Sequence, residues 1–109
     1  MLVLDLTGQR QHLSDAVYDA AEELTRRGYD ENMVGICAGG LIFFLSGEDG
    51  YSCSDGDILN WINNPAALEL ALYIDLREGW QGFDNDEEKA ARDIVKTVAR
   101  HFSERGRSR

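Results

Sequence analysis

Apolar residues recur at helical spacing in the first third of the chain. Val17, Ala20 and Leu24 lie three and four positions apart, which places them on one face of a helix. Ser14, which precedes this series, is a residue type that favours helix starts, and Gly28, which follows it, favours a helix end. The pattern therefore predicts an amphipathic helix between Ser14 and Gly28.

Two further helices are predicted toward the C-terminus. Asn64, followed by a proline, favours a helix start, and Gly79 favours its end. The residues between them are apolar on more than one face, so this helix should be mostly buried. The last helix is expected from about Asp86 to Arg105, and the final residues, 106–109, should fray.

The pattern changes in the middle of the chain. Residues 33–54 contain short apolar runs separated by glycine turns, at Gly39-Gly40 and at 47–50. Such spacing is typical of β-hairpins. It predicts a three-stranded antiparallel meander, in which the central strand, residues 41–45, is apolar on both faces and is covered on both sides.

We expect an α+β fold, in which this small antiparallel sheet packs against three helices. A short strand over residues 2–6 can add to one edge of the sheet as a fourth strand. A short helical turn over residues 57–64 is expected before the second full helix. The chain has 109 residues, which fits a single compact domain, residues 1–109.

Charge is distributed unevenly along the chain, whose net charge is −9. Residues 30–88 hold thirteen acids and one base, Arg77, and therefore a net charge of −12, whereas residues 89–109 hold seven bases and two acids. Phosphates would be repelled by the acidic segment, so direct binding to nucleic acid is not expected. A cationic partner is the natural complement of such a surface.

The densest group of acids, within residues 46–59, does not match a metal site. A calcium loop needs oxygen ligands at alternating positions around a central glycine, and neither this stretch nor the one that begins at Asp84 follows that pattern. Simpler roles fit better, because Asp55 or Asp57 can cap the short helix and the acids after Asp84 complement a helix start. We expect no metal and no cofactor.

Nucleophilic chemistry also lacks a suitable arrangement of residues. Cys37 and Cys53 are expected on the outer strands of the meander, about 9–10 Å apart from strand spacing, which is beyond disulfide reach. Neither His12 nor His101 has a neighbouring ligand at zinc spacing. We therefore expect two inert, half-buried thiols and no enzyme activity.

The sequence also bears on where the protein acts. It contains no apolar run of about 18 residues, so no membrane span is expected. The N-terminal residues lack a base before their short apolar stretch and lack a cleavage-like site, unlike a secretory signal. Two cysteines without an export signal favour a reducing compartment, and we expect a cytoplasmic protein.

Large aromatic residues accompany the acids, with Trp80 and Phe83 in a loop between two acidic stretches. Aromatic residues often anchor protein interfaces, and acids that served solubility alone would be interspersed with bases. We therefore expect a small acidic inhibitor-type binding protein that uses charge mimicry to block a basic surface, such as a nucleic-acid-binding one, on a larger protein. The expected partner-binding residues are Glu48, Asp49, Asp55, Asp57, Trp80, Phe83, Asp84, Asp86, Glu87 and Glu88.

In size, charge and expected α+β form, the chain resembles two groups of proteins. These are phage anti-CRISPR proteins that mimic nucleic acid, and immunity proteins that neutralise nuclease toxins. The alternative function is a structural interaction module, for instance a homodimer that buries Trp61 and Trp80, and a small enzyme is the third class. The inhibitor hypothesis requires the acids of residues 30–88 to converge on one face, whether the protein is a monomer or a homodimer.

Overall fold

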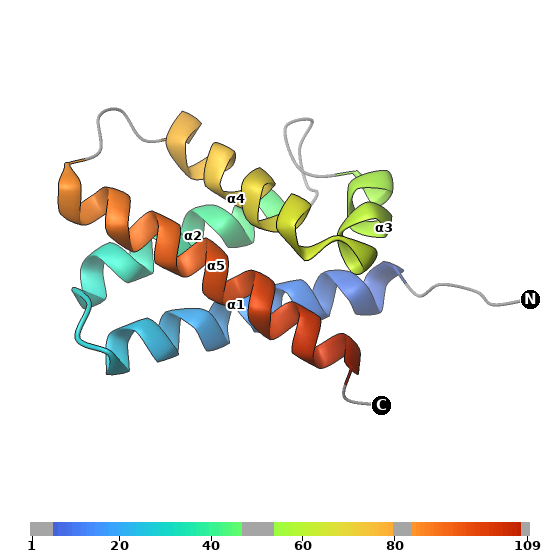
Figure 1. Ribbon diagram of the computed structural model, residues 1–109, viewed down its shortest axis with the longest axis horizontal. Helices are drawn as coiled ribbons and strands as arrows, with labels where there is room; N and C mark the ends of the chain where they lie inside the picture. The colour runs from blue at the N-terminus through green and yellow to red at the C-terminus, as the bar shows by residue number, and fades with distance from the viewer. Residues whose placement is uncertain (1–5, 47–53, 80–83, 108–109) are drawn as a thin grey trace, which may run out of the picture.

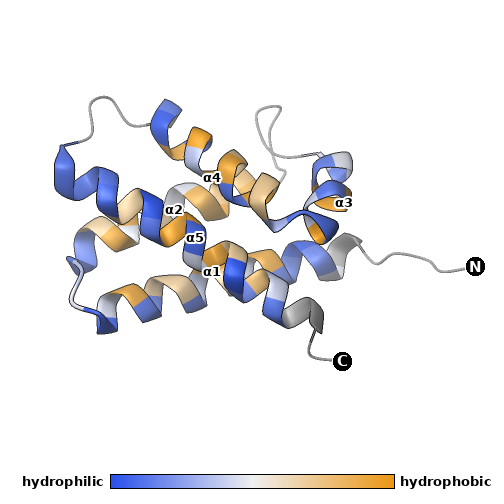
Figure 2. Ribbon diagram, viewed as in Figure 1, coloured by the Kyte–Doolittle hydropathy of each residue, from blue (hydrophilic) through white to orange (hydrophobic). Residues whose placement is uncertain are grey.

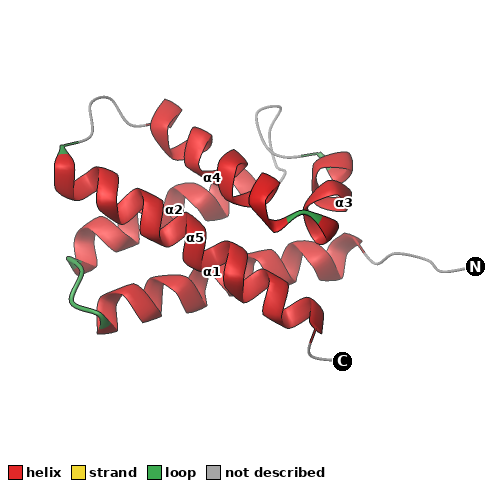
Figure 3. Ribbon diagram, viewed as in Figure 1, coloured by secondary structure: helices red, strands yellow, loops and turns green. Residues whose placement is uncertain are grey.

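The computed structural model describes residues 6–46, 54–79 and 84–107 (Figure 1). In these ranges the chain is helical apart from short connections, and it forms no strand (Figure 3). The helices are α1 (Leu6–Arg26), α2 (Glu31–Ser46), α3 (Asp55–Asn63), α4 (Pro65–Gly79) and α5 (Asn85–Arg107).

The two longest helices, α1 and α5, pack against each other at the centre of the fold. Helix α4 lies along one side of α5, and α2 packs on α1 behind α5 in the view of Figure 1. The short α3 contacts both α4 and α1. Among the described helices, none combines the length and the hydrophobicity needed to cross a membrane.

One hydrophobic core connects all five helices. Burial of each large apolar side chain stabilises such a core by about 1.5–3 kcal/mol. Helices α2 and α4 carry mostly hydrophobic residues, whereas the first turns of α5 are hydrophilic (Figure 2). The largest fully buried side chains are Leu13, Val17, Leu24, Cys37, Leu41, Leu45, Ile58, Leu68, Leu72, Ile94, Val95 and Val98.

The expected α+β fold is wrong, because residues 33–46 belong to helix α2 and not to two strands of a meander. The buried positions of α2 include Val34, Cys37, Leu41 and Leu45. Their spacing of three or four residues is a helical stripe, and this stripe packs against α1, α4 and α5. The remaining faces of α2 are also apolar, which hid the helical period in the sequence.

Gly39 and Gly40 lie in the middle of α2 and form no turn. Both are exposed. A methyl group on Gly39 would meet nothing within 4 Å, and one on Gly40 would meet only the Leu76 side chain at 3.8 Å. Each glycine costs about 1 kcal/mol relative to alanine in a helix, and the buried stripe offsets this cost. The turn expected over 47–50 lies outside the described residues, as does most of the third strand.

The expected helix ends were predicted with unequal success. Helix α4 begins after Asn64, whose side chain accepts a backbone hydrogen bond of 3.3 Å from the first turn, and it ends at Gly79 as predicted. Gly28 follows α1 with a φ of 98°, which favours glycine. The expected start at Ser14 is wrong, because α1 begins at Leu6. Leu6 was expected in a strand, and the rest of that strand lies outside the described residues.

Candidate functional site

The first expected acidic cluster stands at the start of α3. Asp57 and Ser54 form a capping box, in which the Ser54 N–H donates to Asp57 Oδ2 at 2.9 Å and the Asp57 N–H donates to Ser54 Oγ at 3.2 Å. Asp55 accepts a hydrogen bond of 3.0 Å from Arg10 Nη2. Both carboxylates therefore hold α3 in place. The expected members that lie outside the described residues are Glu48 and Asp49.

The second expected cluster surrounds the start of α5. Asp84 and Glu87 form another capping box, in which the Asp84 N–H donates to Glu87 Oε1 at 3.0 Å and the Glu87 N–H donates to Asp84 Oδ1 at 2.8 Å. Asp86 lies between them, is exposed, and takes part in no hydrogen bond or ion pair found among the described residues. Among the described residues, Asp86 is therefore the acid of this cluster whose carboxylate makes the fewest contacts within the chain.

Glu88, the last acid of this cluster, connects α5 to α4. Its carboxylate forms ion pairs with Arg92 at 3.0 Å and with Arg77 at 3.3 Å, and it also accepts a hydrogen bond from the Tyr73 hydroxyl. The Tyr73 hydrogen bond, followed by the Arg92 contacts, lowers the pKa of Glu88. Glu88 is consequently ionised at neutral pH, and its carboxylate already binds partners within its own chain.

The structure does not bring the two acidic clusters together. The start of α3, with Asp55 and Asp57, and the start of α5, with the second cluster, lie toward opposite ends of the long axis of the molecule (Figure 1). The start of α5 lies instead at the same end as the start of α2, where Glu31 is exposed. The described members of the two expected clusters therefore lie on two separate surfaces.

The aromatic residues named from the sequence do not form an exposed anchor in the described part of the chain. Trp61 is only 4% exposed and packs in the core, with its ring centroid 6.3 Å from that of Phe44. This burial leaves Trp61 unable to form the expected dimer contact without unfolding. Trp80 and Phe83 lie outside the described residues.

Sequence reasoning missed several large apolar side chains that remain exposed. Ile36 on α2 and Leu70 on α4 are 61% and 60% exposed, and Tyr18 on α1 is 62% exposed. The sequence contained a signal for the exposure of Ile36 and Leu70, because α2 and α4 are apolar on more faces than a small fold can cover. The same excess of apolar residues predicted that α4 would be mostly buried; Leu68, Leu72 and Leu76 are buried, whereas Leu70 is exposed.

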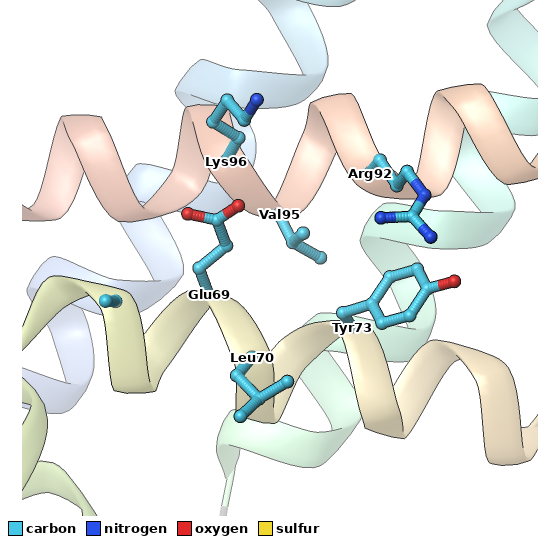
Figure 4. A pocket seen from close by; sticks show the side chains of 7 residues that line it. Glu69, Leu70, Tyr73, Arg92, Val95 and Lys96 are labelled. Atoms are coloured by element: carbon cyan, nitrogen blue, oxygen red, sulfur yellow. The ribbon is translucent and has the colours of Figure 1, made fainter.

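A groove of about 360 Å³ opens between α4 and α5 (Figure 4). Glu69, Leu70 and Tyr73 come from α4, whereas Arg92, Val95 and Lys96 come from α5. The Arg92 guanidinium lies 4.9 Å from the centre of the Tyr73 ring. The groove therefore combines an apolar base with charged rims.

The exposed ridge of α5 is basic. Lys89, Arg92, Lys96 and Arg100 are separated by three, four and four residues, so they share one side of the helix, and all are exposed or partly exposed. Arg92 pairs with Glu88, and Arg100 pairs with a glutamate of α1. Lys89 and Lys96 take part in no ion pair among the described residues. This ridge therefore gathers four bases along one side of α5.

The described residues include one of the two cysteines, Cys37. Cys37 is buried in the core, and this burial, together with the Glu87 carboxylate, raises the pKa of its thiol to about 11. No group of three or more His, Cys, Asp or Glu side chains in the described part of the chain is arranged to hold a metal ion. Cys53 lies outside the described residues.

Comparison with known proteins adds no further information about this fold or its surfaces. No protein family, curated protein or solved structure matched the chain. Its function must therefore be inferred from the surfaces described above.

Proposed function

We propose that this protein is a small, non-catalytic binding protein whose acidic side, the end of the molecule where α2 and α5 begin, occupies a basic surface on a larger protein, for example one that binds nucleic acid. The acids at the start of α3 lie toward the other end, so they are not included in the proposed contact. The carboxylates would stand in for phosphates, accelerate association and block the natural ligand. The observation that carries this proposal is that residues 28–76 contain eight acids and no Lys or Arg. The protein would act in the cytoplasm, where a thiol such as that of Cys37 stays reduced.

The base-free residues form contiguous elements of the fold. They include all of α2 and α3 and most of α4, and α4 packs against both of the others. A basic partner that approached α2 would meet exposed Ile36 and Phe43 along the helix and exposed Glu31 in its first turn. An apolar centre with a charged rim is the usual anatomy of a protein interface.

The acids differ in how freely they can contact such a partner. The capping carboxylates of Asp57 and Glu87 are already used at helix starts. Glu31 and Asp86 are exposed, and no hydrogen bond or ion pair found in the described residues uses their carboxylates. Both lie at the end of the molecule where α2 and α5 begin (Figure 1). These two acids are therefore the best test of charge-directed binding.

The proposal can be tested by affinity capture from a lysate, followed by kinetics with the purified partner. The double variant Glu31→Lys/Asp86→Lys should slow association at least tenfold, and added salt should slow association of the original protein steeply. A matched control, Asp19→Lys/Glu104→Lys, changes the net charge equally outside residues 30–88 and should have a much smaller effect. Equal losses in both variants, or an association rate that is independent of salt, would contradict the proposal.

A further inference from the structure

The groove between α4 and α5 continues beyond the part drawn in Figure 4. A second hollow of about 370 Å³ shares Ala66, Glu69 and Lys96 with the first and extends along α5 to Ser103. The two hollows together follow α5 from Arg92 to Ser103, a length of about 16 Å at the helical rise. This length matches about three turns of a docked helix.

One wall of this combined groove is basic. Arg92, Lys96 and Arg100 follow one another at intervals of four residues along α5, and the next position of this series, at the end of the second hollow, is an acid, Glu104. Glu69 points from α4 toward α5, whereas the Lys96 side chain extends away from α4 (Figure 4), and the two side chains do not form an ion pair among the described residues. The apolar contribution comes from Leu70 and Val95. An amphipathic helix with acids on its contacting face would complement both the charge and the apolar area.

The outer face of α1 is an amphipathic surface that carries such acids. Asp15, Tyr18 and Glu22 lie at intervals of three and four residues and therefore share one face. Tyr18, which is 62% exposed, stands between the two acids. Asp15 accepts a hydrogen bond of 2.9 Å from Gln11, and Glu22 forms an exposed ion pair of 3.6 Å with Arg26. Such exposed contacts contribute little and exchange easily.

We propose that the α4–α5 groove binds the outer face of α1 from a second copy of the chain. Asp15 and Glu22 lie seven residues apart, or about 10 Å along α1, and Arg92 and Arg100 lie eight residues apart, or about 12 Å along α5. Because these spacings are similar, each acid can reach one base while Tyr18 lies between them. Arg92 and Arg100 already pair with Glu88 and Glu23 of their own chain, so each acid of the docked helix would join or replace one of these pairs. Tyr18 then contacts the apolar edge of the groove and the Lys96 ammonium, a favourable arrangement for a cation and an aromatic ring.

This contact would join unlike surfaces, so it is heterologous. Helix α1 and helix α4 lie along opposite edges of the molecule in the view of Figure 1. One copy can therefore donate α1 while its own groove accepts α1 from another copy, which produces a ring or a chain of copies. The contact uses neither Glu31 nor Asp86, so it is independent of the function proposed for the acidic side.

Sedimentation of the full chain with paired charge reversals tests this contact. The unaltered protein should associate with increasing concentration, and Lys96→Glu and Glu22→Lys should each weaken association at least tenfold. Lys96 lies one helical turn from each arginine of the groove, so its charge acts on both acids of the docked helix. In a mixture of the two variants, the acid introduced in one groove meets the base introduced on the other copy's α1, so association should be restored. Tyr18→Ala should also weaken association.

Lys89→Glu is the matched control, because Lys89 shares the basic ridge but does not line the groove; it should change association less than twofold. Circular dichroism of each variant verifies that the helices are retained. A protein that stays monomeric at millimolar concentration would overturn the proposal. Single variants that associate normally, or a mixture that stays dissociated, would overturn it as well.

Discussion

The Tyr73 hydroxyl donates a hydrogen bond of 2.5 Å to the Glu88 carboxylate and so joins α4 to α5. The Arg92 guanidinium contacts both partners, since it binds Glu88 and lies over the Tyr73 ring. The hydrogen bond raises the pKa of Tyr73 and lowers that of Glu88. These contacts also shape one rim of the α4–α5 groove.

Replacing Tyr73 with Phe should make stability depend less on acid pH. A carboxyl group with a lowered pKa adds stability that is present above its unfolded value, 4.5 for Glu88, and is lost as pH falls through the folded pKa. Tyr73→Phe removes the largest cause of that shift. The variant should be less stable than the original protein at neutral pH, and the difference should shrink under acid conditions. Urea unfolding at a series of pH values measures this, and a difference that stays constant with pH would contradict it.

Gly39→Ala should stabilise the protein by about 0.5–1 kcal/mol, because alanine favours a helix and the added methyl group meets nothing within 4 Å. Denaturant unfolding measures the change. Gly28→Ala is the contrasting variant and should destabilise, because Gly28 has a positive φ. If Gly39 occupied a β-turn, its replacement would also be destabilising, so a loss of stability in Gly39→Ala would contradict the assignment of α2.

That contrast also shows why the central part of the fold could not be predicted from the sequence. The pair Gly39-Gly40 is a common hairpin signal, and the apolar residues around it leave no polar face from which to recognise a helical period. Only the packing of Val34, Cys37 and Leu41 against other helices identifies the buried stripe. Helix α4 was predictable because the signals at Asn64 and Gly79 are local.

The same distinction between local and long-range information applies to α1 and to the acids. The early start of α1 accompanies a contact that the sequence does not display, in which Arg10 donates to the Leu45 carbonyl at 3.1 Å and to Asp55. A capping role for Asp57 was predictable, since its partner lies three residues away. The separation of the two acidic clusters was not, because it depends on how α3 and α5 are placed in the fold.

Trp61→Ala should destabilise the protein by about 3–5 kcal/mol, because the indole is almost completely buried and its removal leaves a cavity. Leu59→Ala, two residues away on the same helix, removes an exposed side chain and should change stability by less than about 0.5 kcal/mol. Thermal and urea unfolding provide the comparison. Similar small effects in both variants would contradict the placement of Trp61 in the core.

Cys37 should react with a thiol reagent only when the protein unfolds. Burial removes access to the thiol and raises its pKa to about 11, so little thiolate forms under mildly alkaline conditions. The measurement uses a Cys53→Ser background, in which Cys37 is the one remaining thiol. Labelling should be slow in buffer and complete in denaturant. Rapid labelling of the folded protein would show that α2 does not bury this residue.

Charge reversal at Asp57 and at Asp86 should separate folding from binding. Asp57 completes the capping box of α3, so Asp57→Lys should cost about 0.5–2 kcal/mol of stability, as loss of a helix cap does. Asp86 has no described hydrogen bond, although it lies in the first turn of α5. Asp86→Lys should therefore cost less than about 1 kcal/mol, through the helix dipole alone.

Unfolding measurements on both variants, and on Asp57→Asn, test this difference. Asp57→Asn retains a side-chain oxygen that can accept the Ser54 N–H, so it should recover most of the stability lost in Asp57→Lys. Once a partner is identified, a binding defect in Asp86→Lys that exceeds its stability loss assigns this acid to the interface. If the two lysine variants destabilised the protein equally, the capping box of Asp57 would stabilise α3 no more than Asp86 stabilises α5. Only binding measurements could then distinguish the roles of the two acids.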